Sequence, residues 1–372
     1  MNAFGFSALF VILYAYAGYP VLALGLARVA PRRRALPGAD YEPSVSVCMA
    51  VHNGAQYLAP KLESIQALDY PAEKLEILVY SDGSTDETEA RLAELAQRDP
   101  RIRVIRASER LGKPTALNRL RSEARGEVLL MTDVRQALAP SSLRALVREL
   151  SDPAVGCVSG NLVLRGETGA GAYWRYEKAI RGAEARIGSM VGVSGSIYAI
   201  RRADLRELPR DVLLDDMFVP LAVLRGNKRV ALSHDAEAYD HAYADEQEFG
   251  RKVRTLAGNY QLVAKLPWLL VPFKNPVWFQ FVSHKLLRLL CPWALLVLFV
   301  SSLLLAQATG ISEPERWLWR TLAAGQIAFY ALAALGARAG RLGSLARTFV
   351  VLNVAAVVGL WRFLRGSQAI AW

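Results

Sequence analysis

Hydrophobic residues follow two different patterns along this chain of 372 residues. Near the two ends they form long runs without a charged side chain, at residues 1–27, 289–312 and 321–337. Between residues 44 and 160, short apolar runs alternate with stretches in which apolar residues recur every three or four positions. A helix needs about 20 mostly apolar residues to cross a membrane. The pattern therefore predicts membrane-spanning helices near the ends and a folded α/β domain between them.

The first apolar run favours a membrane anchor over a cleaved signal peptide. It lacks a basic start, and its apolar stretch is too long for a signal. Three arginines follow at 32–34, and basic residues favour the cytoplasmic side of a membrane. We therefore expect an N-terminal transmembrane anchor at 1–30 and a cytoplasmic domain at 31–264.

The remainder of the chain is expected to belong to the membrane. Residues 265–285 mix aromatic residues, prolines and lysines, which favours a segment in the membrane interface with Trp268, Trp278 and Phe279 at headgroup level. Residues 286–372 would then form about three helices, although the candidate at 342–361 contains Arg347. Four crossings would place the C-terminus outside the cell. A re-entrant or interfacial 342–361 would return it to the cytoplasm.

The middle of the chain predicts a mostly parallel sheet with helices on both faces. Its apolar runs predict strands at 45–51, 75–81, 102–106, 127–132 and 155–159. Helical patterns lie between them, at 55–68, 84–98, 113–124 and 140–150. Ser84 and Glu87 have the spacing of a capping box at the start of the second helix. Alternation of strands and helices is typical of this architecture.

Polar residues follow four successive strands, and ligands of such sheets bind at the carboxyl ends of the strands. They are His52 and Asn53, then Asp82, then Gly112 and Lys113, then Asp133 and Arg135. A lysine suits a phosphate, and the two aspartates suit a base N–H, a ribose or a metal ion. Each residue also has a structural alternative: a turn at Asp82, a surface lysine, or a helix cap at Asp133. No GxGxxG or GxxxxGK[ST] motif is present.

Two further clusters lie in the second half of the predicted domain. Asp215 and Asp216 precede a helical pattern, where they suit either a helix N-terminus or a general base whose pKa is raised by its neighbour. Arg251 and Arg254 share a helical face, which suits either a solvated surface or a diphosphate clamp.

Charge and cysteine content narrow the choice of partners. The net charge of +11 is spread along the chain and flanks the apolar runs, without an interleaved aromatic and basic motif. Anionic lipids and phosphate ligands are therefore expected, and nucleic acid is not. Cys48, Cys157 and Cys291 have neither metal-ligand nor disulfide spacing, which fits a reducing compartment.

Taken in series, these motifs resemble those of the membrane-bound enzymes of glycosyltransferase family 2, such as cellulose, hyaluronan and poly-N-acetylglucosamine synthases. VSVCMAVHNGAQYL resembles the family's nucleotide-binding first strand, which places Ala50 and Asn53 at the donor. LEILVYSDGSTDET resembles the motif whose aspartate contacts uracil, here Asp82. LGKPTALN resembles the stretch near the nucleotide that contains Gly112 and Lys113.

The resemblance continues towards the C-terminus, with two departures. LLDDMF resembles the motif of the catalytic base, here Asp216 with Asp215 beside it. RKVRTLAGNYQ stands where the synthases carry QxxRW, so that Arg254 takes the arginine position and Thr255 replaces the tryptophan. The family's metal motif is usually Asp-x-Asp, and here Arg135 takes the place of the second aspartate.

The resemblance implies a GT-A fold, which is a Rossmann-like mixed sheet with helices on both faces. It also implies inverting transfer of a hexose from a nucleotide sugar, with a UDP-sugar expected. The acceptor would be lipid-linked or a polysaccharide at the plasma (inner) membrane of a bacterial-type cell. Asp216 would be the base, while Lys113, Arg251 and Arg254 would stabilise the departing diphosphate.

The altered metal motif changes the expected cofactor chemistry. An arginine cannot ligate a metal, so Asp133 alone is the candidate ligand for Mg2+ or Mn2+. Arg135 is expected to pair with diphosphate oxygens and to supply part of the neutralising charge. The alternative is an outward-facing residue or an ion pair with Asp133. Two other functions remain open: a same-fold enzyme that hydrolyses nucleotide sugars, and a non-catalytic membrane scaffold.

Overall fold

The computed structural model describes residues 2–30, 41–165, 170–241 and 245–369. Its centre is an eight-stranded sheet in the order β3-β2-β1-β4-β7-β6-β8-β5. The strands are β1 (Val45–Val51), β2 (Leu75–Asp82), β3 (Ile102–Ala107), β4 (Val128–Thr132), β5 (Ala137–Leu138), β6 (Val155–Arg165), β7 (Ile197–Arg201) and β8 (Arg229–His241). β1 to β4 run parallel, and β7 is antiparallel to both of its neighbours. The predicted mixed α/β architecture is confirmed.

The five predicted strands coincide with β1 to β4 and the first half of β6. β1, β2 and β4 are buried along nearly their whole length, which explains their apolar runs, whereas the outer strand β3 is only partly buried and contains two arginines. The sequence pattern does not predict β5 or β8. β5 has two residues, and β8 interleaves polar and charged residues with small apolar ones.

Helices pack on both faces of the sheet. They are α3 (Ala55–Gln66), α4 (Thr88–Arg98), α5 (Lys113–Glu123), α6 (Ser142–Leu150) and α8 (Asp215–Arg225), with short 3-10 turns η2 (Ala72–Lys74) and η3 (Arg202–Asp204). The predicted capping box is wrong, because α4 begins at Thr88. The Ser84 hydroxyl instead accepts the N–H of Asn53 at 3.1 Å, and Asp86 accepts the N–H of Thr88 at 3.0 Å.

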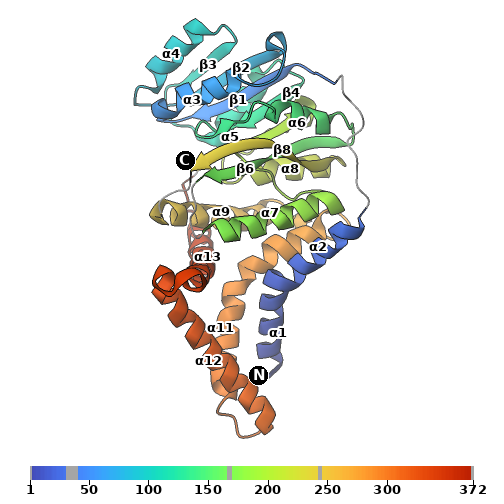
Figure 1. Ribbon diagram of the computed structural model, residues 1–372, viewed down its shortest axis with the longest axis vertical. Helices are drawn as coiled ribbons and strands as arrows, with labels where there is room; N and C mark the ends of the chain where they lie inside the picture. The colour runs from blue at the N-terminus through green and yellow to red at the C-terminus, as the bar shows by residue number, and fades with distance from the viewer. Residues whose placement is uncertain (1, 31–40, 166–169, 242–244, 370–372) are drawn as a thin grey trace.

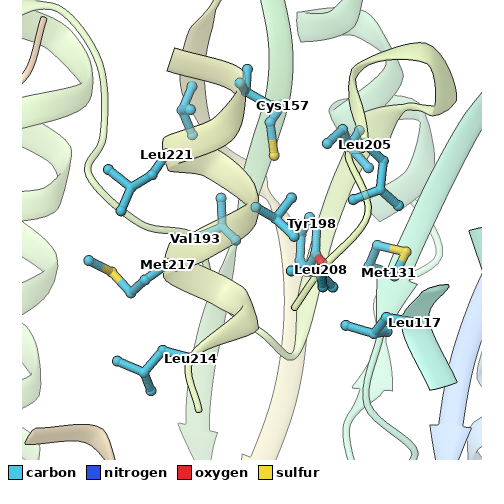
Figure 2. Close-up of a cluster of buried hydrophobic side chains, with 14 of the residues drawn as sticks. Leu117, Met131, Cys157, Val193, Tyr198, Leu205, Leu208, Leu214, Met217 and Leu221 are labelled. Atoms are coloured by element: carbon cyan, nitrogen blue, oxygen red, sulfur yellow. The ribbon is translucent and has the colours of Figure 1, made fainter. Parts of the chain in front are cut away.

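Alternate residues of β1 belong to two hydrophobic cores, one on each face of the sheet. Val47 packs with α3 and α6, whereas Cys48 packs with α5 and α8. Figure 2 shows part of the second core, in which Leu214 and Met217 at the start of α8 lie on the same side as Leu221. Burial of these two residues fixes the first turn of α8, and with it the acidic pair that lies between them in sequence.

Three helical segments are long and apolar enough to cross a membrane: Asn2–Val29, Trp278–Leu305 and Glu313–Leu364. The first contains α1 (Asn2–Leu13), the π-helical turn η1 (Tyr14–Gly18) and α2 (Tyr19–Val29). The second contains α10 (Trp278–Gln280), the π-helical turn η5 (Phe281–Leu286) and α11 (Leu287–Leu305). The third contains α12 (Glu313–Leu335), the 3-10 turn η6 (Gly336–Ala339) and α13 (Gly340–Leu364). Gly336 and Gly340 have positive φ angles of 55° and 68°, which separates α12 from α13.

Two helices lie between the sheet and the apolar helices (Figure 1): α7 (Ala170–Ile187) and α9 (Asp245–Lys265), which the 3-10 turn η4 (Pro267–Leu270) follows. α13 packs closely along α9, since a Cβ on Gly359 would come 2.9 Å from the backbone nitrogen of Ala257. Tyr260 of α9 also stacks on Phe363, with ring centroids 6.4 Å apart. The end of α13 therefore lies beside the sheet domain, whereas the N-terminus lies at the opposite end of the molecule (Figure 1).

Candidate active site

A lysine joins two carboxylates at the carboxyl ends of the parallel strands. Lys113 begins α5, and its Nζ lies 2.9 Å from Oδ1 of Asp133 and 3.2 Å from Oδ2 of Asp215. Asp133 follows β4, and Asp215 begins α8. Burial opposes the charge of Lys113, but the two carboxylates outweigh burial and raise the pKa of the ammonium. The site therefore contains a fixed positive charge.

Asp216 is the carboxylate best suited to accept a proton. It is half-buried on the first turn of α8. Burial and the neighbouring Asp215 raise its pKa from 3.8 to about 6, although Lys113 and Arg181 act in the opposite direction. A carboxylate with this pKa is mostly ionised at pH 7 and still holds a proton more firmly than an exposed aspartate, which suits a general base.

The turn between α7 and β7 encloses these carboxylates. A Cβ on Gly195 would lie 3.7 Å from Oδ2 of Asp133 and 3.9 Å from Oδ2 of Asp216. The N–H of Val193 donates to the backbone carbonyl of Asp216 at 2.9 Å, which ties the turn to α8. Because residue 195 has no side chain, space beside both carboxylates stays open to a ligand.

Asp82 organises the loop that carries Lys113. It is fully buried, and its two carboxylate oxygens accept the N–H groups of Leu111 and Gly112 at 2.8 and 2.9 Å. Gly112 has a φ of 87°, and a Cβ on Gly83 would collide with the backbone of the same loop. The structure thus favours the alternative in which Asp82 shapes a turn over direct contact with a base.

Asn53 and Ala50 also serve the local framework. The Asn53 side chain accepts the N–H of Thr85 at 2.8 Å, which joins the loops after β1 and β2. Asn53 itself is exposed and has a positive φ of 49°. Ala50 is buried in the core beside Tyr80. Its side chain is therefore enclosed by protein, and Asn53 remains the more accessible of the two.

Arg135 forms an ion pair that the sequence does not predict. Its Nε is 2.8 Å from Oδ1 of Asp240, a buried residue of β8. Gln136 donates to the other oxygen of the same carboxylate at 2.8 Å. β5 pairs with β8 directly after this loop, which brings the two charges together. The ion pair anchors the loop after Asp133 and does not support a diphosphate role for Arg135.

The sequence does not single out Lys61, which lies behind this loop. Lys61 is buried on α3, and its Nζ donates to the Thr132 hydroxyl and to the Gln136 carbonyl, both at 2.6 Å. Burial lowers its pKa to about 7, although Asp133 opposes the shift. A signal exists in the sequence, because Lys61 occupies an apolar position of its helix between Leu58 and Leu62.

The predicted arginines of α9 lie on a helix that packs against the start of α8. A Cβ on Gly258 would come 2.4 Å from Leu214, the residue before the acidic pair. Arg254 precedes Gly258 by one turn and therefore shares this face. Arg254 is half-buried, whereas Arg251 is exposed. Their contact with a diphosphate remains a prediction.

The donor atoms for a divalent cation are few. Within the described ranges no three His, Cys, Asp or Glu side chains are grouped as metal ligands. Asp133 is partly exposed, and its carboxylate already pairs with Lys113. One carboxylate fits a cation that is held largely by the phosphates of a substrate, which is how Mg2+ commonly binds.

Comparison with known proteins finds similarity in both sequence and structure. Residues 46–208 match the family model "Glycosyl transferase family 2". An N-acetylglucosaminyltransferase of Rhizobium sp. (strain N33) is 31% identical over 189 residues, which cover 48% of this chain and 42% of that protein. A beta-monoglucosyldiacylglycerol synthase of Synechocystis sp. is 29% identical over 118 residues, which cover 31% of this chain and 25% of that protein. The chain thus matches less than half the length of these curated relatives.

One solved structure is similar over nearly the entire chain. It is a mannosyltransferase from Pyrobaculum calidifontis in complex with GDP-Man and Mn2+. The similarity covers 98% of this chain and 100% of that chain, with 25% sequence identity and a TM-score of 0.78. The likeness therefore includes the apolar helices as well as the sheet.

Proposed function

We propose that this chain, whose residues 46–208 match the family model "Glycosyl transferase family 2", is a membrane-integrated inverting glycosyltransferase. It would transfer a hexose from a nucleotide sugar to a lipid-linked or polysaccharide acceptor. The observation that carries the proposal is Asp216, a half-buried carboxylate with a pKa of about 6, next to the ammonium of Lys113. The two groups provide a base and a positive charge within one site.

In the proposed reaction, Asp216 accepts the proton of an acceptor hydroxyl. The hydroxyl oxygen then forms a bond to the anomeric carbon of the donor sugar, on the face opposite the nucleotide. The bond from that carbon to the diphosphate oxygen breaks, and the nucleoside diphosphate leaves with the electron pair. Lys113 stabilises the negative charge that develops on the diphosphate.

Asp215 and Asp133 position the charges for this step. Both carboxylates hold the ammonium of Lys113, and Asp215 also raises the pKa of Asp216. A divalent cation held by Asp133 and the donor phosphates would add Lewis-acid stabilisation of the leaving group. Arg254, from the adjacent face of α9, would extend the positive charge towards the diphosphate.

The identity of the donor base is a separate part of the proposal. The sequence motif around Asp82 suggests a uridine nucleotide, whereas the similar mannosyltransferase was solved with GDP-Man. Because both carboxylate oxygens of Asp82 accept backbone N–H groups, we infer that Asp82 acts on donor affinity through the loop before Lys113. Selection between uracil and guanine in the donor would then depend on the exposed polar groups near Asn53.

We further propose that the sheet domain lies on the cytoplasmic side of the membrane. The chain would cross the membrane three times: with the segment that contains α1 and α2, with α11 and with α12. The contact between α13 and α9 supports a C-terminal helix that returns to the surface of the domain. A cysteine introduced by Ser367→Cys, at an exposed position, should react with a membrane-impermeant maleimide only in inverted vesicles. Labelling in right-side-out vesicles would contradict this topology. The native cysteines are buried.

Activity can be tested with the purified full-length chain in lipid nanodiscs. A panel of radiolabelled nucleotide sugars would be supplied with lipid extract as the acceptor, and products would be separated by size. We expect label to enter a glycolipid or polymer with wild-type protein and not with Asp216→Asn. Release of nucleoside diphosphate and free sugar alone would identify a hydrolase. Absence of both turnover and nucleotide binding would favour a scaffold.

A further inference from the structure

Two cationic side chains lie where the sheet domain meets the apolar helices, and one of them attracts the candidate base. Arg181 lies on α7, and its Nη2 atom is buried without a hydrogen-bond partner among the described residues. Lys285 lies in η5, near the start of the helical segment Trp278–Leu305. Arg181 repels Lys285, and it also attracts the carboxylate of Asp216. Arg181 therefore lies within electrostatic reach of both Asp216 and Lys285.

Two glutamates of α7, Glu177 and Glu184, attract these cations but form their hydrogen bonds with other side chains. Glu184 accepts the hydroxyl of Tyr19 at 2.7 Å and lies 2.8 Å from Nδ1 of His284. Glu177 lies 3.1 Å from Nε2 of the same histidine and also accepts the guanidinium of Arg288. Burial would raise the pKa of both glutamates, but these partners lower it, so both remain ionised. The glutamates attract Arg181 and Lys285, yet the hydrogen bonds that they form are to other side chains.

This arrangement leaves the guanidinium of Arg181 incompletely satisfied and places Lys285 near a like charge. A buried N–H of a charged group without an acceptor costs free energy, and two like charges in a low-dielectric environment repel each other. An anion between them would remove both costs. The planar guanidinium of Arg181 suits a phosphate, which it can contact with two parallel N–H groups, and Lys285 would add a second positive charge.

The position of the pair indicates where the anion comes from. Ile180 and Ala183 of α7 pack against Tyr19 and Ala23 of α2. α7 itself lies between the sheet and the apolar helices (Figure 1). The site is thus at the junction of the domain and its first and second candidate spans, the level at which headgroup phosphates lie.

We infer that Arg181 and Lys285 bind the phosphate of a lipid acceptor beside Asp216. The inference rests on the proposed function for its catalytic consequence. The phosphate is recognised and is not transferred, while a hydroxyl of the group attached to the same lipid loses its proton to Asp216 and attacks the donor sugar. The acceptor is therefore an anionic lipid rather than a neutral diacylglycerol.

Binding can be measured without turnover, by calorimetry on the full-length chain in nanodiscs of neutral lipid. The probes are dioctanoyl phosphatidic acid, dioctanoylglycerol and inorganic phosphate. We expect phosphatidic acid to bind at least tenfold more tightly than the other two. Arg181→Met and Lys285→Met should each weaken its binding about tenfold or more, the scale of one charge-assisted hydrogen bond. Arg175→Met, an exposed arginine of the same helix, is the matched control and should change nothing.

Several results would overturn the inference. Equal binding of phosphatidic acid and dioctanoylglycerol by the wild type would exclude a phosphate site, and this comparison needs no variant. Equal binding of inorganic phosphate would exclude a lipid source. Weaker binding of UDP or GDP by Arg181→Met, with phosphatidic acid unaffected, would assign the cations to the donor diphosphate. Arg181→Lys, which keeps the charge, should retain part of the affinity, and it tests the site if the methionine variant does not fold.

The outcome is separable from that of the proposed function. If phosphatidic acid binds as expected and no nucleotide sugar is used, the anion site stands and the glycosyltransferase proposal fails. If sugar transfer occurs and Arg181→Met keeps its affinity for phosphatidic acid, the anion site alone is refuted.

Discussion

The substitution Asp216→Asn should lower turnover and raise stability in the same protein. In the folded chain the pKa of Asp216 rises from 3.8 to about 6, chiefly through burial and through Asp215. This change in pKa corresponds to about 3 kcal/mol of free energy. The folded-state pKa of Asp216 lies above the unfolded-state pKa. The free energy of unfolding therefore decreases by this amount as the pH rises from about 4 to above 6. At pH 7.5 the whole cost is present.

Asparagine has the same shape and carries no charge, so Asp216→Asn should recover part of this free energy. About 3 kcal/mol is the upper limit, because the net shift already includes the attraction of Asp216 to Lys113 and Arg181, and the amide of asparagine is itself a polar group in a partly buried position. The melting temperature at pH 7.5 should therefore increase in detergent or nanodiscs. Turnover should fall by at least about 100-fold, the scale of general base catalysis. Glu207→Gln, which changes an exposed acid, should alter neither quantity.

The pH dependence of the wild type provides the third measurement. Only the ionised carboxylate can accept a proton, so the rate should fall on the acid side with a midpoint near pH 6. Asp215→Asn removes a repulsive charge and should move this midpoint to lower pH. Transfer by Asp216→Asn within threefold of the wild-type rate would refute the assignment of the base. An acid limb that Asp215→Asn does not move would refute the electrostatic explanation.

Three further predictions concern the loops around this base. Asp82→Ala should leave two backbone N–H groups of the loop before Lys113 without their acceptor, so the melting temperature and nucleotide binding should decrease together. Normal stability with weak nucleotide binding would instead support direct contact of Asp82 with the nucleobase. Arg135→Ala and Asp240→Ala should each lower the free energy of unfolding by about 3–5 kcal/mol, and the double variant should cost less than their sum. Nucleoside diphosphate affinity should stay unchanged in Arg135→Ala, and a selective loss would restore its predicted diphosphate role. A chelator should reduce the rate only in part, because the Lys113 ammonium supplies positive charge without a metal. Asp133→Ala should abolish the remaining dependence of the rate on divalent cations. Complete loss of activity in chelator would show that Lys113 cannot substitute for the metal.

Local patterns in the sequence were sufficient for much of the fold. Apolar runs identified β1, β2 and β4, because strands buried on both faces need apolar residues at nearly every position, and the alternating run at 102–106 identified the half-buried β3. The order of strands and helices then implied that the residues after each strand meet at one edge. That inference holds for Lys113 and Asp133, which form an ion pair in the structure.

Tertiary structure decided which polar groups these residues contact. Arg135 was expected at the diphosphate, but the pairing of β5 with β8 places it against Asp240. Asp82 was expected at a base, but its oxygens accept N–H groups of the loop after β3. Arg181 and Lys285 were not singled out at all, since α7 and η5 are brought together only by packing. Hydrophobic periodicity is a local property of the chain, whereas the partner of a charge depends on which distant elements become neighbours, and a buried charge must find its partner there.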